Sequence, residues 1–257
     1  MTLFHRDLGG VGNPPLVILH GLLGSSRNWQ TAGRDLAARY HVRALDLRNH
    51  GSSPQAAEMD YEVLVNDVSE YLDTHALTRV TLLGHSLGGK VAMRLACRQP
   101  ERVEQLVVVD IAPRAYSSAA HRAEFEAMAA IDLAGLASRA AAEQLLEAKV
   151  PDWAMRKFLV TNLEHTAEGR WRWLVNLPVL MASLPVLEAD SLAPTDRFAG
   201  PSLFVVGGRS GYVREEDGPA MLRHFPQARI DTLPQAGHNP HIDSRADFVA
   251  RLFSALP

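Results

Sequence analysis

The chain has 257 residues, of which 47% are hydrophobic, and a formal net charge of -3 at pH 7. This length and composition fit one large domain with a sizeable core and room for an inserted subdomain. The small net charge gives no reason to expect a nucleic-acid partner.

Cysteine content and the N-terminal residues bear on the compartment. Cys97 is the only cysteine, which excludes an intramolecular disulfide and indicates a reducing compartment. We expect it to be a small buried hydrophobic residue. Polar residues His5, Arg6 and Asp7 stand where a signal peptide would need an apolar run. No segment approaches the ~20 apolar residues of a membrane span. We therefore expect a cytoplasmic protein without a membrane span.

Apolar runs and turn residues predict strands alternating with helices in the first half of the chain. A short edge strand is a candidate at 3–5, followed by a turn at 9–14. Further strands are expected at 15–19, 41–45, 79–83 and 103–109, and helices at 28–39, 63–76 and 89–99. Such alternation predicts an α/β fold with a mostly parallel sheet covered by helices on both faces.

The alternation stops at about residue 114. Residues 114–196 read as helical, with no convincing strand, and we interpret them as a helical lid inserted between two core strands. Its candidate helices are 121–130, 138–149, 152–163 and 171–177. The core, residues 1–113 and 197–257, resumes with strands at 201–206 and 228–233 and helices at 216–225 and 245–256.

A G-x-S-x-G motif, Gly84-His85-Ser86-Leu87-Gly88, follows the strand at 79–83. A strand before and a helix after this motif are the context of a nucleophile elbow. Ser86 would occupy a turn with positive φ, which a non-glycine residue adopts only when its surroundings hold it there. We therefore expect Ser86 to be a catalytic nucleophile, the alternative being an ordinary Gly/Ser turn.

Ligands of such sheets bind at the carboxyl ends of the strands, where further polar motifs fall. A serine nucleophile needs a base, and His238, after the last expected strand, is the candidate. His241 is expected to be a solvated neighbour. His20 ends an early strand and is expected to hold its loop. The N–H groups of Leu22 and Leu87 are candidate oxyanion donors, with an ordinary glycine turn as the alternative at Leu22.

Two other groups of residues have competing interpretations. Asp46 and Arg48 are expected to tie their loop by hydrogen bonds. The alternative is a metal site, because Asp46, His50, His85 and His238 could approach one another. The sequence has no motif with the spacing of known metal ligands, so we expect no metal. The aromatic residues of 114–196 pack the lid or line an acyl pocket. The candidate pocket residues are His20, Tyr116, Trp173 and Tyr212.

Together these motifs resemble the α/β-hydrolase superfamily. The resemblance is carried by His20-Gly21-Leu22-Leu23-Gly24, Asp46-Leu47-Arg48-Asn49-His50-Gly51-Ser52-Ser53-Pro54, Gly84-His85-Ser86-Leu87-Gly88-Gly89-Lys90 and Gly237-His238. Asp110-Ile111-Ala112-Pro113 and Arg172-Trp173-Leu174-Val175-Asn176-Leu177 are similar to the YbfF-type esterase group. The resemblance implies hydrolysis of short acyl esters, in some members of acyl-CoA thioesters, by serine, histidine and an aspartate, without a metal or organic cofactor.

The position of the acid departs from the superfamily pattern. Ser210 stands where the usual aspartate would follow the strand after the lid. The remaining candidates are Asp46, Asp110, Asp243 and, more weakly, Asp217. Asp46 is better explained as a loop tie, and Asp243 opens the last helix. Asp110 ends the strand after the elbow helix, and the YbfF-type resemblance also places the acid here, so we predict Asp110; the alternative is a turn residue.

We therefore expect a serine hydrolase that cleaves short-chain carboxylic esters through an acyl-enzyme, with a small-molecule acyl ester or thioester as its partner. An acyl-CoA thioesterase or a C–C bond hydrolase is the rival on the same triad. Haloalkane dehalogenases and epoxide hydrolases are disfavoured, because their resemblance would place an aspartate at position 86. From another class, a non-catalytic hydrolase-fold binding protein remains as an alternative. No oligomeric state is predicted.

Overall fold

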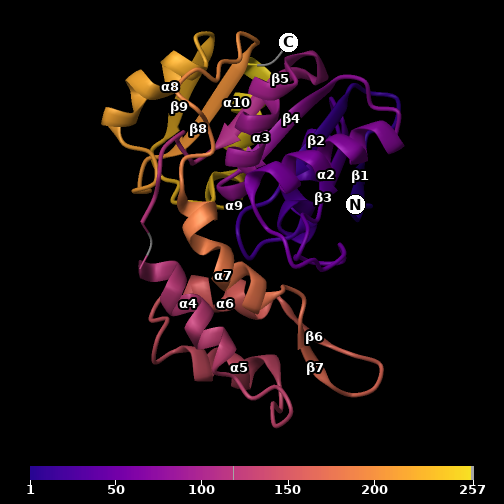
Figure 1. The fold of residues 1–257 in the computed structure, drawn as a ribbon, viewed down its shortest axis with the longest axis vertical. Coiled ribbons are helices and arrows are strands. Elements are labelled where there is room, and N and C mark those ends of the chain that lie inside the picture. Colours follow the sequence, from indigo (N-terminus) through magenta and orange to yellow (C-terminus); the bar gives the residue numbers. More distant parts are fainter. Residues whose placement is uncertain (118, 256–257) are drawn as a thin grey trace.

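In the computed structural model, which describes residues 1–117 and 119–255, the chain forms an α/β fold around a seven-stranded sheet (Figure 1). The strand order is β1-β3-β2-β4-β5-β8-β9. β1 pairs with β3 antiparallel, and the other neighbours pair in parallel. The strands are β1 (His5–Gly9), β2 (Pro15–Leu19), β3 (His41–Leu45), β4 (Val80–His85), β5 (Val103–Val109), β8 (Ser202–Gly207) and β9 (Ala228–Leu233). The predicted fold class is confirmed.

The inner strands are apolar throughout because both faces of the sheet are covered. Every residue of β4 is buried. Successive residues of a strand point to opposite faces, so Leu82 joins one hydrophobic cluster and Leu83 the other. The first cluster also holds residues of α2 (Tyr61–Thr74), α3 (Leu87–Arg98) and α8 (Gly218–His224). The second holds residues of α1 (Gln30–Leu36) and α10 (Arg245–Ala255).

Short helical turns connect these elements. They are the 3-10 turns η1 (Ser26–Trp29), η2 (Pro100–Arg102) and η3 (Glu215–Asp217), and the short helix α9 (Pro240–Asp243). The helix expected at 28–39 therefore begins as a 3-10 turn and ends at Leu36. The expected last helix ends at Leu256, which lies outside the described residues. In the part of the chain that the structure describes, no helix is both long and apolar enough to cross a membrane.

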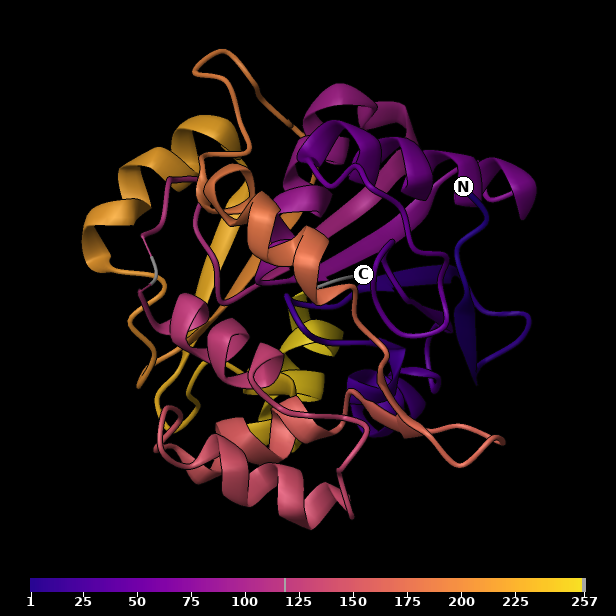
Figure 2. The ribbon, with the colours of Figure 1, turned by 60° about the horizontal axis from the view of Figure 1, so that its bottom comes forward.

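The insertion between β5 and β8 lies at one end of the sheet (Figures 1 and 2). It contains α4 (Ala119–Ala129), α5 (Arg139–Leu146), α6 (Trp153–Val160), β6 (Leu163–His165), β7 (Trp171–Trp173) and α7 (Leu177–Glu188). The expectation of a strand-free insertion is wrong, because β6 and β7 form an antiparallel hairpin. Gly169, at φ 76°, provides the positive φ of its turn.

The helix expected at 171–177 is also wrong, since Trp171-Arg172-Trp173 is a strand and the helix begins at Leu177. Alternation of aromatic and polar residues suits a strand. The first proline of α7, Pro178, lies in its first turn, where an N–H has no intrahelical partner. Pro185 lies inside the helix. No helix was predicted at 178–188, where Pro185 is a residue type that is disfavoured in a helix interior.

Candidate active site

Ser86 occupies the sharp turn between β4 and α3, with φ 50° and ψ -117°. Its backbone N–H donates to the carbonyl of Val109, 3.1 Å away. A Cβ added at Gly84 would lie 2.2 Å from the carbonyl oxygen of Gly88, and one added at Gly88 would lie 2.4 Å from that of Leu19. Both motif glycines are therefore required by close backbone approach, and the positive φ predicted for Ser86 is present.

The structure places His238 against Asp110. The imidazole Nδ1 donates to Oδ2 of Asp110 at 2.7 Å. The carboxylate is fully buried and also accepts from the N–H of Gly207 at 2.9 Å and from the hydroxyl of Ser210. Asp110 itself has φ 50°, which directs its side chain into this arrangement. Ser210, found in the usual place of the acid, thus bonds to the acid that comes from the neighbouring strand.

The other three carboxylates considered as the acid are engaged elsewhere. Asp46 accepts from the N–H groups of Ser26 at 2.6 Å and Ser52 at 2.8 Å, and so ties its loop as expected. Asp217 forms an ion pair with Arg114 at 2.9 Å. Asp243 accepts from the N–H of Gly237 at 2.8 Å. Of the four candidates, Asp110 is the one in contact with His238.

Two residues hold His238 in place: His85, which was weighed only as a metal ligand, and Tyr212, which was expected to line the substrate pocket. Nε2 of His85 donates to the carbonyl oxygen of His238 at 2.8 Å, and burial lowers the pKa of His85 well below its usual value. The ring of Tyr212 stacks on the imidazole of His238, with centroids 3.8 Å apart and planes at 17°. The hydroxyl of Tyr116 in turn donates to the carbonyl of Tyr212 at 2.8 Å. The position of His85 beside Ser86 in the motif was the available signal.

The candidate oxyanion donors border a small cavity beside Ser86. Leu22 and Leu87 both line it, and Leu87 is the first residue of α3, where N–H groups point out of the helix. His20 fixes the loop that carries Leu22: its Nδ1 donates to the carbonyl of Gly21 at 2.8 Å and its Nε2 accepts from the N–H of Leu47 at 3.0 Å. His20 therefore holds its loop, as expected from the sequence.

Two cavities meet at Ser86, and their linings differ. The small one has a volume of about 40 Å³ and is bordered by Leu22, Leu87, Ile111, Tyr116, Leu187 and other residues. The large one has a volume of about 420 Å³ and is bordered by residues that include His20, His121, Glu124, Phe158, Tyr212 and His238. Three of the four candidate pocket residues thus line a cavity. Trp173 lines neither of them, because it lies on the hairpin β6–β7, which projects sideways from the insertion (Figure 1).

The environment of His241 differs from the one expected. It was expected to be solvated, but it is buried and stacks on the indole of Trp29, with ring centroids 3.9 Å apart and planes at 10°. Burial lowers the pKa of His241 to about 3, so its ring is neutral near neutral pH. The wall of the large cavity therefore gains an uncharged aromatic surface from this histidine.

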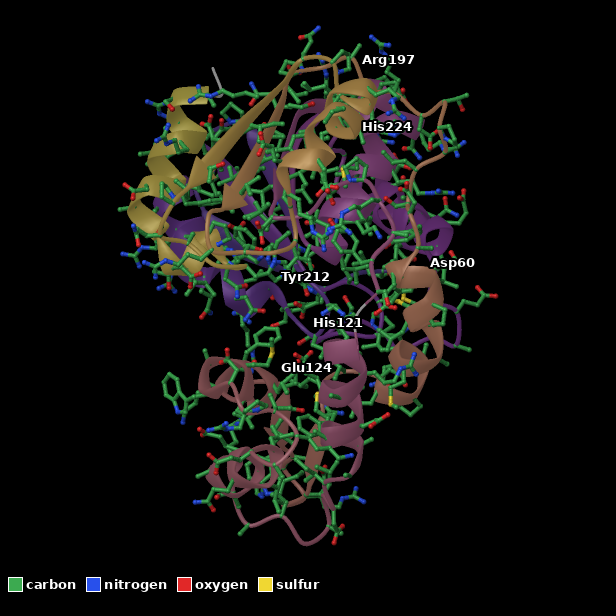
Figure 3. All side chains as sticks on the ribbon, turned by 90° about the vertical axis from the view of Figure 1, so that its left-hand side faces the viewer. Asp60, His121, Glu124, Arg197, Tyr212 and His224 are labelled. Atoms are coloured by element: carbon green, nitrogen blue, oxygen red, sulfur yellow. The ribbon has the colours of Figure 1, made fainter. Side chains whose placement is uncertain are left out.

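Helix α4 contributes two ionisable groups that sequence reasoning missed, His121 and Glu124. Figure 3 shows both, with Tyr212, at the junction between the insertion and the core. Burial raises the pKa of Glu124 to about 7 and lowers that of His121 to about 4. Their spacing of three residues puts them on one face of the helix, but nothing in the sequence shows which face meets the core.

The residues weighed as metal ligands have other partners. His50 accepts from the N–H of Leu23 at 3.3 Å and donates to the carbonyl of Arg48 at 2.9 Å. The guanidinium of Arg48 pairs with Asp67 at 2.6 Å, as a loop tie should. Across residues 1–117 and 119–255 there is no group of three or more His, Cys, Asp or Glu side chains that could hold a metal ion.

The chain was compared with protein families, curated proteins and solved structures. A family model described as alpha/beta hydrolase fold matches residues 14–244. The sn-1-specific diacylglycerol lipase ABHD11 of Mus musculus is 38% identical over 252 residues, covering 95% of this chain and 81% of the relative. Esterase YbfF of Escherichia coli K12 is 34% identical over 239 residues, covering 93% and 91%. The solved structure of a marine microorganism esterase superimposes with a TM-score of 0.96 at 32% identity, covering 100% of both chains.

Proposed function

The chain belongs to the α/β-hydrolase fold family, to the group that contains YbfF and ABHD11, and is a carboxylic ester hydrolase; from this premise we propose that it cleaves short-chain esters through an acyl-enzyme formed on Ser86. His238 serves as the base and Asp110 as the acid that orients it. The single observation that carries the assignment is the 2.7 Å hydrogen bond from His238 to a buried carboxylate, beside a cavity that His238 shares with Ser86.

The geometry supports a two-step reaction. The hydroxyl oxygen of Ser86 attacks the ester carbonyl while Nε2 of His238 takes its proton, and the N–H groups of Leu22 and Leu87 stabilise the oxyanion. The bond between the carbonyl carbon and the alcohol oxygen then breaks, and His238 returns the proton to that oxygen. Water, activated by His238, releases the acid and restores Ser86.

The positions of the cavities suggest which part of the ester each one takes. His238 must protonate the departing alcohol, so the alcohol lies on the side of the large cavity, which His238 lines. The acyl group then extends into the small cavity beside Leu22 and Leu87. Its volume of about 40 Å³ holds about three non-hydrogen atoms, since one water occupies at least 10–15 Å³ by the same measure. This supports a preference for short acyl chains.

Residues 114–196 are proposed as a lid on a core formed by 1–113 and 197–257. Support comes from the large cavity, whose wall includes His121 and Glu124 on α4 and Met155 and Phe158 on α6. These helices close the space above the strand ends and help to exclude water from it. The expected cytoplasmic location stays a prediction.

Diacylglycerol hydrolysis and acyl-CoA hydrolysis are the rival activities. The mouse relative is named an sn-1-specific diacylglycerol lipase, and a diacylglycerol substrate of this chain could carry a long acyl chain. That chain would have to occupy the large cavity, with the alcohol on the other side of Ser86. We expect the opposite assignment, because His238 lines the large cavity.

A panel of nitrophenyl esters from acetate to palmitate, with acyl-CoA thioesters and a diacylglycerol, tests this proposal. The highest kcat/KM is expected for acetate to butyrate and should fall for longer chains. A maximum at palmitate or at the diacylglycerol would contradict the assignment of the cavities. A maximum at the acyl-CoA thioesters would favour the rival thioesterase activity.

A further inference from the structure

The large cavity beside Ser86 has a strongly one-sided charge. Its lining contains three carboxylates, from Glu124, Asp152 and Asp243, and, among the described residues, neither lysine nor arginine. The histidines other than His238 add no positive charge near neutral pH. Burial lowers the pKa of His121 to about 4 and that of His241 to about 3, and it also lowers the pKa values of His20 and His85.

Glu124 is the carboxylate of this set without a partner. Asp152 accepts from the N–H of Met155 at the start of α6, at 3.0 Å, and Asp243 accepts from the N–H of Gly237. Glu124 is only 9% exposed, and within the described chain its carboxyl makes neither a hydrogen bond nor an ion pair. It extends from α4 toward the core near Tyr212 (Figure 3).

A buried carboxylate without a partner is unfavourable until a cation or a set of donors reaches it. A positive group inside the cavity would be attracted by the buried Glu124 with little competition from water, whereas water screens the charge of the exposed Asp152. The side of the ester that enters this cavity is the alcohol, because His238 protonates the leaving oxygen from there.

We propose that the enzyme prefers esters whose alcohol part carries a positively charged group, and that Glu124 is the residue that recognises this charge. The inference rests on the proposed ester hydrolysis at Ser86 and on the assignment of the alcohol to the large cavity. Glu124 acts in specificity and takes no part in bond breaking. An alcohol part with a phosphate or carboxylate is disfavoured by the same charges.

The direct test compares two esters of the same shape, acetylcholine and its uncharged carbon analogue 3,3-dimethylbutyl acetate, by acetate release. At pH 8 the kcat/KM of the wild type should favour the cation by on the order of tenfold. Glu124→Gln should bring the ratio of the two kcat/KM values close to one. Glu126→Gln is the matched control, because Glu126 lies on the same helix but is exposed and outside the cavity, and it should keep the wild-type ratio.

The pH dependence of this ratio separates charge recognition from a structural effect. Burial, with the nearby Asp152, raises the pKa of Glu124 to about 7, so its negative charge develops between pH 6 and pH 8. The other ionisable groups that face it are His121, neutral in this range, Tyr212, whose pKa burial raises to about 12, and Asp152. Glu188 at the end of α7 lies beyond His121, 3.9 Å from its ring.

In the wild type the preference for the cation should therefore rise from pH 6 to pH 8, and in Glu124→Gln it should stay flat. Any ionisation that turnover of both esters requires equally cancels in the ratio. Equal kcat/KM values for the two esters at pH 8, with hydrolysis of both, would overturn this inference and leave the esterase intact. Failure to hydrolyse these esters and nitrophenyl acetate alike would overturn the proposed function as well.

Discussion

At the scale of the residue, Asp110 is supported by a hydrogen-bond set that spans two strands. Its carboxylate accepts from Gly207 and Ser210, which end β8 and begin the following loop, as well as from His238. Three donors favour the charged carboxylate in a fully buried position, where a charge would otherwise be unfavourable. A buried aspartate so held can orient an imidazole and stabilise the imidazolium formed during catalysis.

Replacing Asp110 by asparagine should preserve folding and lower kcat by up to about 10⁴, because the amide favours the wrong tautomer of His238. Ser210→Ala removes one hydrogen bond to a charged group, worth about 1.5–3 kcal/mol, and should lower kcat by about 10- to 100-fold. Steady-state rates with nitrophenyl acetate and circular dichroism would measure both effects. Asp217→Asn is the control; collapse of its turnover, with wild-type turnover in Asp110→Asn, would show that the acid is misassigned.

Ionisation of Glu124 should also make the free energy of unfolding depend on pH. Its pKa is about 7 in the folded chain against 4.5 for an ordinary glutamate, so its contribution is full below pH 4.5 and is lost as the pH rises through 7. Glu124→Gln should therefore raise Tm at pH 8, by the equivalent of at most about 3 kcal/mol. At pH 5 the difference should nearly vanish. Thermal melts of the wild type, Glu124→Gln and the control Glu126→Gln at both pH values test this prediction. An unchanged or lower Tm of Glu124→Gln at pH 8 would contradict the burial argument.

At the scale of the element, the elbow helix α3 holds the end of the insertion helix α7. The ammonium of Lys90, on α3, lies 3.4 Å from the carbonyl oxygen of Leu187 and 3.3 Å from that of Glu188, and also bonds to the carbonyl of Ala189. These are the carbonyls that a helix end leaves without intrahelical partners. Lys90 therefore couples the turn at Ser86 to the proposed lid.

Lys90→Met should loosen this helix end, because it removes the charged donor that the three carbonyls share. Leu187 and Glu188 each keep one donor, the hydroxyl of Tyr61 and the N–H of Tyr116, so we expect a loss of about 1 kcal/mol. We expect amide hydrogens at 187–190 to exchange faster, while those of β4 remain protected. Hydrogen exchange followed by mass spectrometry would measure this. Lys157→Met, at an exposed ion pair on α6, should leave exchange at 187–190 unchanged. Equal protection of the amides at 187–190 in Lys90→Met and in the wild type would show that Lys90 does not hold the end of α7.

The elements differ in how well the sequence predicts them. β2 and β5 have the predicted bounds, because apolar runs between helices indicate buried strands. β9 also has the predicted bounds, although it is an edge strand in which only Leu233 is buried. The hairpin β6–β7 was missed because three residues per strand are too few to establish a period of two. Helix α7 was not predicted at 178–188, where Pro185 is disfavoured in a helix interior. Within the insertion, packing against the core overrides local preference.

At the scale of the whole molecule, parallel strand order explains why distant residues meet. β4, β5, β8 and β9 are consecutive in the sheet, so the residues after β4 and β5 and the loop after β9 converge at one edge. This allowed Ser86, Asp110 and His238 to be chosen from the sequence together. The cavities could not be predicted, because their walls depend on where the insertion rests: Glu124 faces the cavity, and Trp173 does not.

The central claim is that Ser86, activated by His238, forms a covalent acyl-enzyme, and active-site labelling tests it most directly. A fluorophosphonate probe followed by peptide mass spectrometry should find one adduct, on Ser86, in the wild type. Ser86→Ala should lose both the adduct and the esterase activity, on the order of 10⁴–10⁶ in kcat, while Ser254→Ala, at an exposed serine of α10, should keep both. An adduct on another residue, or labelling and turnover that persist in Ser86→Ala, would contradict the account.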